Sequence, residues 1–304
     1  MKRLNQKSKS ILIVGGTGFI GYHLLIRAKQ LNWKLTSISR NAPKKFRTIK
    51  GVKYLKINVS NKKDINKKLK KNFNFVLNLA GDSSGAFSKL NNCQKYKSQF
   101  IAGKNIIDFF SRKKIDKFIQ IGSSSEYGAI TTPHQENNKC SPKSSYGKSK
   151  LLITKYLLNA VKKYSFNANI IRLFQVYGKK QSKNKIIPFL IDKCKKNKKF
   201  DLTAGNQTRD FCYIDDVVEA IFLLLNKKKI RGEIFNIGYG QSITIKSLTK
   251  LIQKKIKKGK PNFGAIKIKK NEIKNSKASI NKINKFTKWK PKIDLETGIK
   301  LLIN

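Results

Sequence analysis

Short apolar runs alternate with amphipathic segments along the first half of the chain. Residues 11–14 form a continuous apolar run, the pattern of a strand buried on both faces. After a glycine-rich stretch, residues 22–31 carry apolar side chains at helical spacing. Strands alternating with helices predict a Rossmann-type α/β fold with a doubly wound parallel sheet. The further predicted strands are 34–40, 52–57, 73–79 and 117–121, and the helices are 64–69, 96–110 and 145–164.

The stretch between the first strand and the first helix reads Gly-Gly-Thr-Gly-Phe-Ile-Gly. A strand, a glycine turn and a helix in this order are typical of a dinucleotide-binding loop. Glycines let the backbone approach a pyrophosphate, and the helix offers N–H groups and the positive end of its dipole. The alternative is a tight turn whose glycines serve only helix–strand packing. We predict a cofactor site that includes Gly15, Gly18, Phe19, Ile20 and Gly21.

The end of the second predicted strand bears on which dinucleotide is bound. In this fold an acidic residue about twenty residues past the glycines bonds the adenosine ribose and selects NAD. Ser39 and Arg40 stand there instead, with no carboxylate nearby. A hydroxyl and a guanidinium would accept a 2′-phosphate, so the sequence favours NADP(H). NAD is the alternative if Arg40 is only a surface cation. Ala80, at the end of the fourth strand, is small enough for the cofactor to lie close.

The chain is strongly basic, with 68 Lys and Arg against 16 Asp and Glu and a formal charge of +52. The lysines are spread over almost every predicted surface, together with Asn and Ile. A nucleic-acid reader would gather its cations on one element, with aromatic residues between them. We interpret the charge as compositional drift on a solvated surface and expect no nucleic-acid partner. Any dianionic substrate would still meet an attractive field.

Several other sites and locations are disfavoured by the sequence. No apolar run reaches membrane-spanning length, and the basic start leads into the first strand without the apolar segment of a secretory signal. The four cysteines are scattered, which suits a reduced compartment better than a disulfide framework or a zinc site. We expect a cytoplasmic protein with no membrane partner and no metal.

A candidate catalytic pair opens the long helix 145–164. Tyr146 and Lys150 lie four residues apart and project from one helical face. An ammonium beside a phenol stabilises the phenolate and lowers its pKa from about 10 toward neutrality, as general acid–base catalysis requires. Ser123, which follows the fifth strand, could bond the same substrate oxygen. Because ligands gather at the carboxyl ends of parallel strands, we expect the glycine turn, Ala80 and Ser123 to face one crevice.

The chain resembles an extended short-chain dehydrogenase/reductase, of the branch of epimerases, dehydratases and reductases that modify nucleotide-activated sugars. The resemblance covers almost the whole length and is specific for the family but much less so for the reaction. It rests on GGTGFIG (Gly15–Gly21), NLAG (Asn78–Gly81), GSSSEYG (Gly122–Gly128), YGKSK (Tyr146–Lys150), RLFQVYG (Arg172–Gly178), TRDFCYIDDVVEAI (Thr208–Ile221), NIG (Asn236–Gly238) and KWKPKIDLETGIK (Lys288–Lys300).

The resemblance implies roles for particular residues. Ser123, Tyr146 and Lys150 would be the catalytic triad, with Tyr146 and Lys150 also contacting the cofactor and Lys150 holding the nicotinamide ribose. Arg209 would bind the substrate diphosphate, a role that suits a guanidinium fork; a salt bridge to Asp210 or Asp215 is the alternative. Ser84, Ser123 and Gln175 complete the expected substrate-binding set.

Departures from the family pattern help to choose a reaction. Dehydratases of this branch carry an acid two positions before the tyrosine of the Tyr-Gly pair, where this chain has Ser125. A hydroxyl does not readily take a carbon-bound proton, so dehydration is disfavoured. Glu126 lies one place later, and we expect it to anchor its loop through a hydrogen bond. Gln175 replaces the usual Asn, which leaves the nucleotide and sugar open.

We expect a cofactor-binding Rossmann domain at 1–171 and a smaller substrate-binding lobe at 172–304, from which residues 234–237 return to the main sheet. Asp215 and Asp216 would cap the helix that follows them. By resemblance the protein would be a homodimer formed through the helices 96–110 and 146–164.

The leading hypothesis is an NADPH-dependent reductase of a 4-keto nucleotide-diphosphate sugar, which makes an activated deoxysugar for a surface polysaccharide. A nucleotide-sugar 4-epimerase with tightly bound NAD is the nearest alternative. A non-catalytic, RNA-associated protein that has kept the fold is an alternative of another class.

Overall fold

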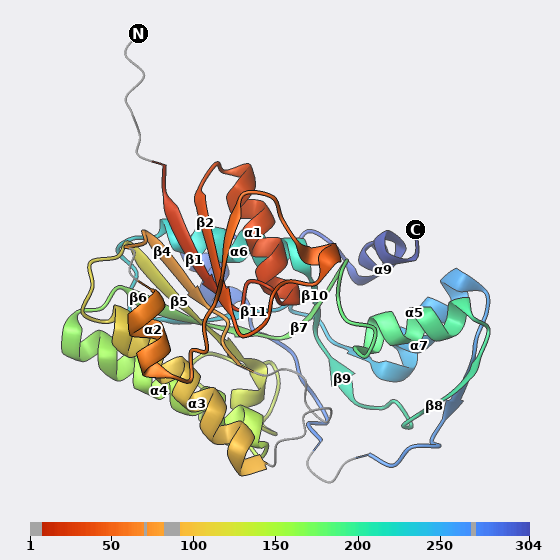
Figure 1. The fold of residues 1–304 in the computed structure, drawn as a ribbon. Helices are drawn as coiled ribbons and strands as arrows, with labels where there is room; N and C mark the ends of the chain where they lie inside the picture. Colours follow the sequence, from red (N-terminus) through yellow and green to blue (C-terminus); the bar gives the residue numbers. More distant parts are fainter. Residues whose placement is uncertain (1–7, 70–71, 82–91, 269–271) are drawn as a thin grey trace. The chain divides into compact units, whose positions relative to one another are not determined.

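Seven strands form the main sheet of the computed structural model, which describes residues 8–69, 72–81, 92–268 and 272–304 (Figure 1). The strand order is β11-β6-β5-β4-β1-β2-β3, and the pairs that join β5, β4, β1, β2 and β3 are parallel. The predicted Rossmann-type sheet is confirmed, including the return of β11. The strands are β1 Ser10–Val14, β2 Lys34–Ser39, β3 Val52–Lys56, β4 Phe75–Asn78, β5 Lys117–Ser123, β6 Ala168–Leu173 and β11 Ile234–Ile237.

The position of β1 between two neighbouring strands explains its continuous apolar run. The side chains of Ile11, Leu12 and Ile13 in β1 are completely buried, as the continuous apolar run predicted. Ile11 lies opposite Leu35 of β2 on one side and Phe75 of β4 on the other. A parallel strand with neighbours on both edges and helices on both faces has no solvent-facing side, which is why apolar residues fill it without alternation.

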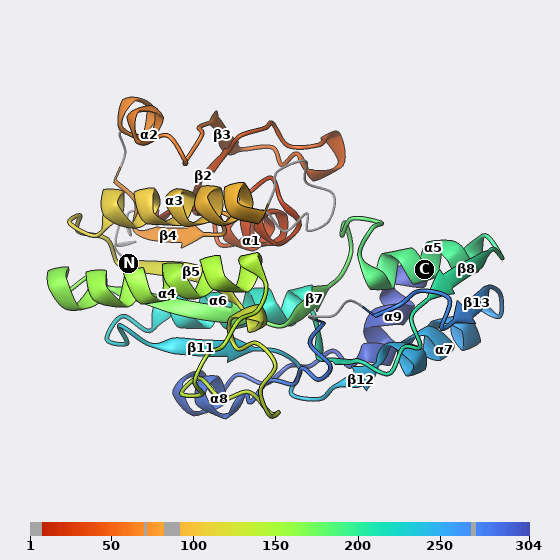
Figure 2. The same ribbon diagram turned by 90° about the horizontal axis from the view of Figure 1, so that it is seen from below.

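The four helices predicted at 22–31, 64–69, 96–110 and 145–164 lie close to those ranges. α1 packs against β1 and β2, and α3 and α4 run side by side (Figure 2). A Cβ added at Gly103 of α3 would come within 2.9 Å of the Ile153 side chain of α4, so the glycine permits close packing. The helices are α1 Phe19–Gln30, α2 Lys62–Lys68, α3 Asn92–Phe110, α4 Ser145–Tyr164, α5 Ile186–Lys195, α6 Ile214–Asn226, α7 Ile245–Ile256, α8 Asn281–Thr287 and α9 Leu295–Ile303.

The chain divides into two compact units and passes between them several times. The first unit comprises the chain up to Ile121 together with Leu152–Ile170 and Leu225–Glu233. The second comprises Gly122–Leu151, Ile171–Leu224 and Ile234–Asn304. The glycine turn therefore belongs to the first unit, and the predicted catalytic triad belongs to the second.

The described part of the second unit contains three two-stranded sheets, which join segments that are far apart in the sequence. β7 pairs with β10 and β8 with β13, both in parallel, and β9 pairs with β12 in antiparallel orientation. α7 packs against both α5 and α9. The strands are β7 Gln175–Tyr177, β8 Lys199–Leu202, β9 Thr208–Arg209, β10 Phe211–Tyr213, β12 Ile243–Thr244 and β13 Lys260–Phe263.

The predicted capping role of Asp216 is wrong. α6 begins at Ile214, so Asp216 lies within its first turn. Its carboxylate accepts hydrogen bonds from the backbone N–H groups of Lys292 and Ile293, both at 3.0 Å. The indole of Trp289 donates to the Asp216 carbonyl at 3.1 Å. Asp216 thus fastens the segment before α9 to α6.

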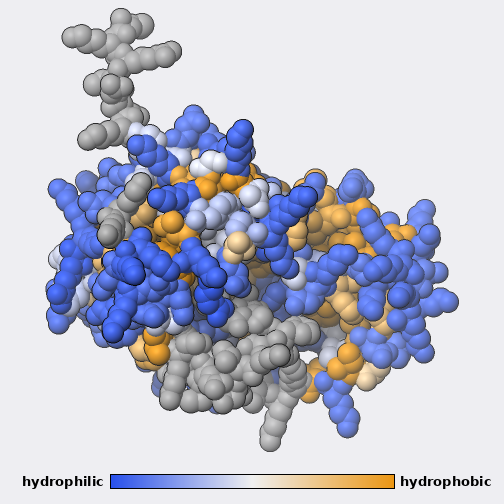
Figure 3. Space-filling view, viewed as in Figure 1, coloured by the Kyte–Doolittle hydropathy of each residue, from blue (hydrophilic) through white to orange (hydrophobic). Residues whose placement is uncertain are grey.

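Hydrophilic side chains cover most of the face shown in Figure 3, as expected for lysines spread along the chain. Among the described residues no helix is both long and apolar enough to span a membrane.

Candidate functional site

The glycine turn of the first unit has the geometry of a phosphate cradle. Gly15 has φ +84°, a conformation that favours glycine. A Cβ added at Gly21 would lie 2.5 Å from the Gly15 carbonyl oxygen and from the Gly16 Cα, so this position must be glycine. α1 starts at Phe19 without a side-chain cap and without an acidic residue in its first turn. The N–H groups of Phe19, Ile20 and Gly21 therefore stand at an uncapped helix N-terminus, which suits a pyrophosphate.

The predicted residues at the end of β2 have different surroundings. The Ser39 hydroxyl donates to the Asn41 carbonyl at 2.7 Å, which turns the loop. Arg40 is exposed to solvent. A second arginine was missed by the sequence reasoning: Arg47, in the short 3-10 helix η1 (Lys45–Arg47), is only 9% exposed. Its guanidinium lies 3.5 Å from the Thr17 carbonyl of the glycine turn, and burial lowers its pKa.

Ala80 follows β4 and is buried, with its backbone N–H donating to the Asn78 side chain at 3.0 Å. The Asn78 amide in turn donates to Gln120 of β5 at 2.8 Å. This pair of amides ties the two strand ends together. The approach of the cofactor to Ala80 stays a prediction.

A tight turn at the end of β5 carries the first predicted catalytic residue. Ser123 is the last residue of β5 and caps the 3-10 helix η3 (Ser124–Glu126), so the strand is two residues longer than predicted. The Ser123 hydroxyl accepts a hydrogen bond from the Ser125 N–H at 3.2 Å. The Glu126 carboxylate accepts one from the Ser123 N–H at 2.8 Å, which completes a capping box. The expectation that Glu126 anchors its loop is confirmed.

The start of α4 packs against this turn. The Ser144 hydroxyl accepts a hydrogen bond from the Gly147 N–H at 3.0 Å and so caps the helix. A Cβ added at Gly147 would lie 2.3 Å from the Ser125 carbonyl oxygen, so glycine is needed for this close approach. Tyr146, the neighbour of Gly147, is thereby brought next to the turn that holds Ser123.

Lys150 is 3% exposed, and its ammonium lies 5.8 Å from the centre of the Tyr146 ring. Burial lowers the pKa of Lys150 to about 8, although the negative charge of Glu126 raises it. Ser123, Tyr146 and Lys150 all lie in the part of the second unit that runs from residue 122 to residue 151. A hydroxyl, a phenol and an ammonium in this arrangement can bond a substrate oxygen and move its proton.

A buried ion pair lies behind the turn. Arg172 of β6 donates from Nε to Glu126 at 3.0 Å, and its guanidinium lies 4.5 Å from the centre of the Tyr127 ring. The Tyr127 hydroxyl donates to Asn236 at 2.7 Å. Because Glu126 is fully engaged here, it is not placed to act as a base.

The predicted substrate residues are spread over other elements. Gln175 begins β7, pairs with Phe211 of β10 and lines a small hollow together with Lys185. Arg209 of β9 donates to the backbone carbonyls of Thr208 and Ile273, both at 2.8 Å, and forms an ion pair with Glu272. Ser84 lies outside the described residues.

Asp210, one of the two acids considered as an ion-pair partner of Arg209, has other hydrogen-bond partners. Asp210 is completely buried and accepts the N–H groups of Tyr239, Gly240 and Ala278. Burial raises the pKa of Asp210 to about 6, although these donors lower it. Arg209 pairs with Glu272 instead, a residue 63 positions further along the chain.

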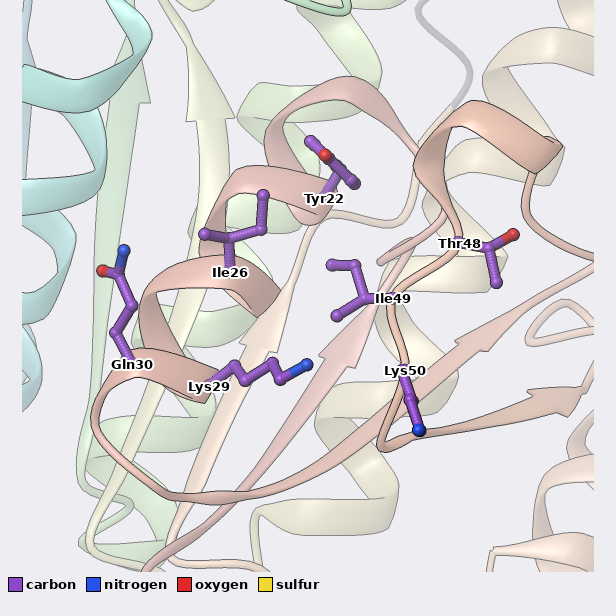
Figure 4. A pocket seen from close by; sticks show the side chains of 7 residues that line it. All are labelled: Tyr22, Ile26, Lys29, Gln30, Thr48, Ile49 and Lys50. Atoms are coloured by element: carbon purple, nitrogen blue, oxygen red, sulfur yellow. The ribbon is translucent and has the colours of Figure 1, made fainter.

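An open groove elsewhere in the first unit contains none of the predicted site residues (Figure 4). The lining of the groove comes from α1 and from the segment after η1: Tyr22, Ile26, Lys29, Gln30, Thr48, Ile49 and Lys50.

Within the part of the chain that the structure describes, no group of three His, Cys, Asp or Glu residues is placed to bind a metal ion.

Comparison with known protein families agrees with this geometry. The model of the NAD dependent epimerase/dehydratase family matches residues 11–238. The chain belongs to that family. It is therefore a nicotinamide-dependent enzyme, and the glycine turn and the Ser123, Tyr146 and Lys150 group lie within the matched part.

Individual relatives of this epimerase/dehydratase family member carry different activities in their names. It is 29% identical over 303 residues to a putative UDP-glucose 4-epimerase of Methanocaldococcus jannaschii, covering 97% of each chain. It is 27% identical over 321 residues to a dTDP-4-dehydro-6-deoxyglucose reductase of Escherichia coli, covering 99% of this chain and 98% of the relative. The UDP-glucose 4-epimerase structure from Thermotoga maritima has the same fold, with a TM-score of 0.90, 24% identity and 97% of each chain covered.

Proposed function

We propose that this enzyme is an NADPH-dependent reductase of a 4-keto nucleotide-diphosphate sugar that makes an activated deoxysugar for a surface polysaccharide. The observation that carries the proposal is the basic, acid-free end of β2. Arg40 is exposed there, and the buried Arg47 lies beside the glycine turn. Two guanidinium groups would attract a 2′-phosphate, whereas the carboxylate that selects NAD is missing.

The residues present fit a dinucleotide. The uncapped start of α1 and the glycines that no Cβ could replace would hold its pyrophosphate. When bound, the nicotinamide supplies a hydride for the keto carbon of the substrate. Tyr146 would give the proton to the keto oxygen, Ser123 would bond that oxygen, and the Lys150 ammonium would stabilise the phenolate that remains.

The environment of Glu126 supports reduction over dehydration. A dehydratase needs a base beside the serine turn, and the nearest acid in the sequence is Glu126. Its carboxylate is buried and bonded to the Ser123 N–H and to Arg172. Ser125, which stands where dehydratases of the family carry their base, has only a hydroxyl. Arg209 is the proposed contact of the substrate diphosphate, and Gln175 is a further proposed substrate contact.

A 4-epimerase is the second candidate, because relatives of the chain carry that name. An epimerase returns the hydride to the opposite face of the same sugar and keeps its nicotinamide bound. We also propose a homodimer formed through α3 and α4, which run side by side.

The test is a steady-state assay in which the protein, NADPH or NADH, and 4-keto-6-deoxy nucleotide sugars are mixed and cofactor oxidation is followed. We expect exchangeable binding and a clear preference for NADPH. Arg40→Ala and Arg47→Ala should each raise the KM for NADPH about 10- to 100-fold, the loss of one charge-assisted contact, and leave the KM for NADH unchanged.

Lys45→Ala is the matched control, because Lys45 is an exposed cation of the same 3-10 turn. It should leave both KM values close to those of the parent. Stoichiometric NAD that does not exchange, together with interconversion of UDP-glucose and UDP-galactose, would instead establish the epimerase.

A further inference from the structure

Glu126 connects the catalytic turn to a buried cation through its two carboxylate oxygens. Oε1 accepts the Ser123 N–H at 2.8 Å, and Oε2 accepts the Nε–H of Arg172 at 3.0 Å. The exposed fractions of the Glu126 and Arg172 side chains are 0% and 3%. A buried ion pair adds little to stability compared with an apolar pair, so its presence beside a catalytic turn calls for another explanation.

Glu126 links the ion pair to the catalytic group. Glu126 acts on Lys150 of α4, whose buried ammonium lies over the Tyr146 ring. The charges of Glu126, Tyr127 and Cys140 act on the guanidinium of Arg172 in β6. Burial alone would lower the pKa of Arg172, but the charge of Glu126 raises it above its ordinary value, so the guanidinium stays charged.

Glu136 is a second acid on which the charge of Arg172 acts, and its other neighbours differ from those of Glu126. Its carboxylate accepts the Asn236 N–H at 2.9 Å, and the charges of Lys282 and Arg172 act on it. Glu126 is the acid whose negative charge raises the pKa of Lys150, against the lowering by burial.

We propose that Glu126 and Arg172 are positioning residues: their ion pair fixes the backbone of Ser123 and sets the net charge next to Tyr146 and Lys150. The inference rests on the catalytic roles proposed for Ser123, Tyr146 and Lys150. Loss of the Glu126 charge leaves a buried cation uncompensated, which makes proton release from Tyr146 and Lys150 easier. Loss of the Arg172 charge leaves a buried anion and makes proton release harder.

The test uses Glu126→Gln, which keeps an acceptor for the Ser123 N–H but removes the charge, and Arg172→Gln. The phenolate absorbance of Tyr146 is titrated with pH in the protein without substrate, and the signal of the matching Tyr146→Phe variant is subtracted. We expect the midpoint to fall by about one pH unit in Glu126→Gln and to rise by about one unit in Arg172→Gln. Glu136→Gln is the matched control and should leave the midpoint unchanged.

The double variant Glu126→Gln/Arg172→Gln leaves no uncompensated charge, so it should titrate like the parent protein even if a single variant fails to fold. Glu126→Asp should also keep the midpoint, because it retains the charge, but should lower kcat because the shorter side chain withdraws from Ser123. Equal midpoints in all variants, shifts of the same sign in both single variants, or a shifted double variant would overturn the inference.

This titration needs no sugar substrate, so the two proposals can fail separately. If the protein does not reduce 4-keto sugars but the midpoint shifts in opposite directions in the two single variants, the proposed function is wrong and this inference stands. If the protein reduces 4-keto sugars but the midpoint does not shift, the proposed function stands and this inference is wrong.

Discussion

Among the described residues of this very basic chain two lysines are buried, and they have opposite kinds of surroundings. Lys117 is the first residue of β5 and is completely buried, while Lys150 lies in the second turn of α4 and is 3% exposed. Burial lowers the pKa of each to about 8. A lowered lysine pKa is therefore not by itself a sign of catalysis, although perturbed pKa values do concentrate at functional sites.

Neutral oxygens surround Lys117. Its ammonium donates to the side-chain carbonyl of Asn167 at 2.5 Å and to the backbone carbonyls of Ile230 and Lys228, at 2.5 Å and 3.5 Å. Such a site satisfies the donors of the ammonium without an anion. Lys150 has the charge of Glu126 and the Tyr146 ring nearby. What separates the two is a phenol on the same helical face as Lys150, which in the proposed mechanism makes the buried ammonium part of a proton-transfer group.

The largest difference between the two lysines should appear in turnover. Lys150→Met removes the ammonium that stabilises the Tyr146 phenolate, so we expect kcat for the 4-keto substrate to fall about 10³-fold. Lys117→Met should leave kcat close to the parent value. Steady-state kinetics with NADPH measures both, with circular dichroism to show that each variant is folded. A similar loss in both variants would mean that burial alone, and not the neighbouring phenol, decides the role.

The lowered pKa of Lys117 should make the free energy of unfolding depend on pH. The unfolded chain holds the Lys117 proton up to about pH 10.5, whereas the folded protein releases it at about 8. Between these values the unfolded state binds more protons, so the free energy of unfolding rises with pH. In Lys117→Met that rise should be smaller by about 2–3 kcal/mol over this range.

Urea unfolding at a series of pH values from neutral to alkaline measures the slope. Lys150→Met should reduce the rise in the same direction, because the pKa of Lys150 is lowered too. Equal slopes in the parent and the Lys117→Met variant would show that the ammonium stays protonated in the folded protein.

Local patterns explain which features the sequence could predict. The strands β1–β5 and the helices α1, α3 and α4 follow from hydrophobic period. The glycine turn, the Tyr146–Lys150 spacing and the Ser123–Glu126 loop anchor each lie within a few residues of chain. Such short-range relations can be read from sequence because helix and turn geometry fix them.

Long-range contacts could not be predicted in the same way. Arg172 pairs with Glu126 across 46 positions, Arg209 with Glu272 across 63, and Arg47 reaches the glycine turn across 30. In a chain with 68 basic residues, nothing local marks these arginines as the ones that reach distant partners. Their partners depend on how the strands are ordered in space, which a single sequence does not state. The same limit applies to Asp216, which bonds a segment 76 positions away.

The smallest expected effect concerns the neutral site of Lys117. Asn167→Ala removes the side-chain oxygen that accepts from Lys117 and the amide that donates to the Asp116 and Lys228 carbonyls. The ammonium keeps only backbone carbonyls, so we expect the free energy of unfolding to fall by about 1–2 kcal/mol while kcat stays unchanged. Asn262→Ala is the matched control, because its amide bonds exposed Asp201 at 2.8 Å and should matter by less than about 0.5 kcal/mol. If Asn167→Ala were to lower kcat without lowering stability, Lys117 would belong to the catalytic apparatus after all, and the contrast between charged and neutral surroundings would fail.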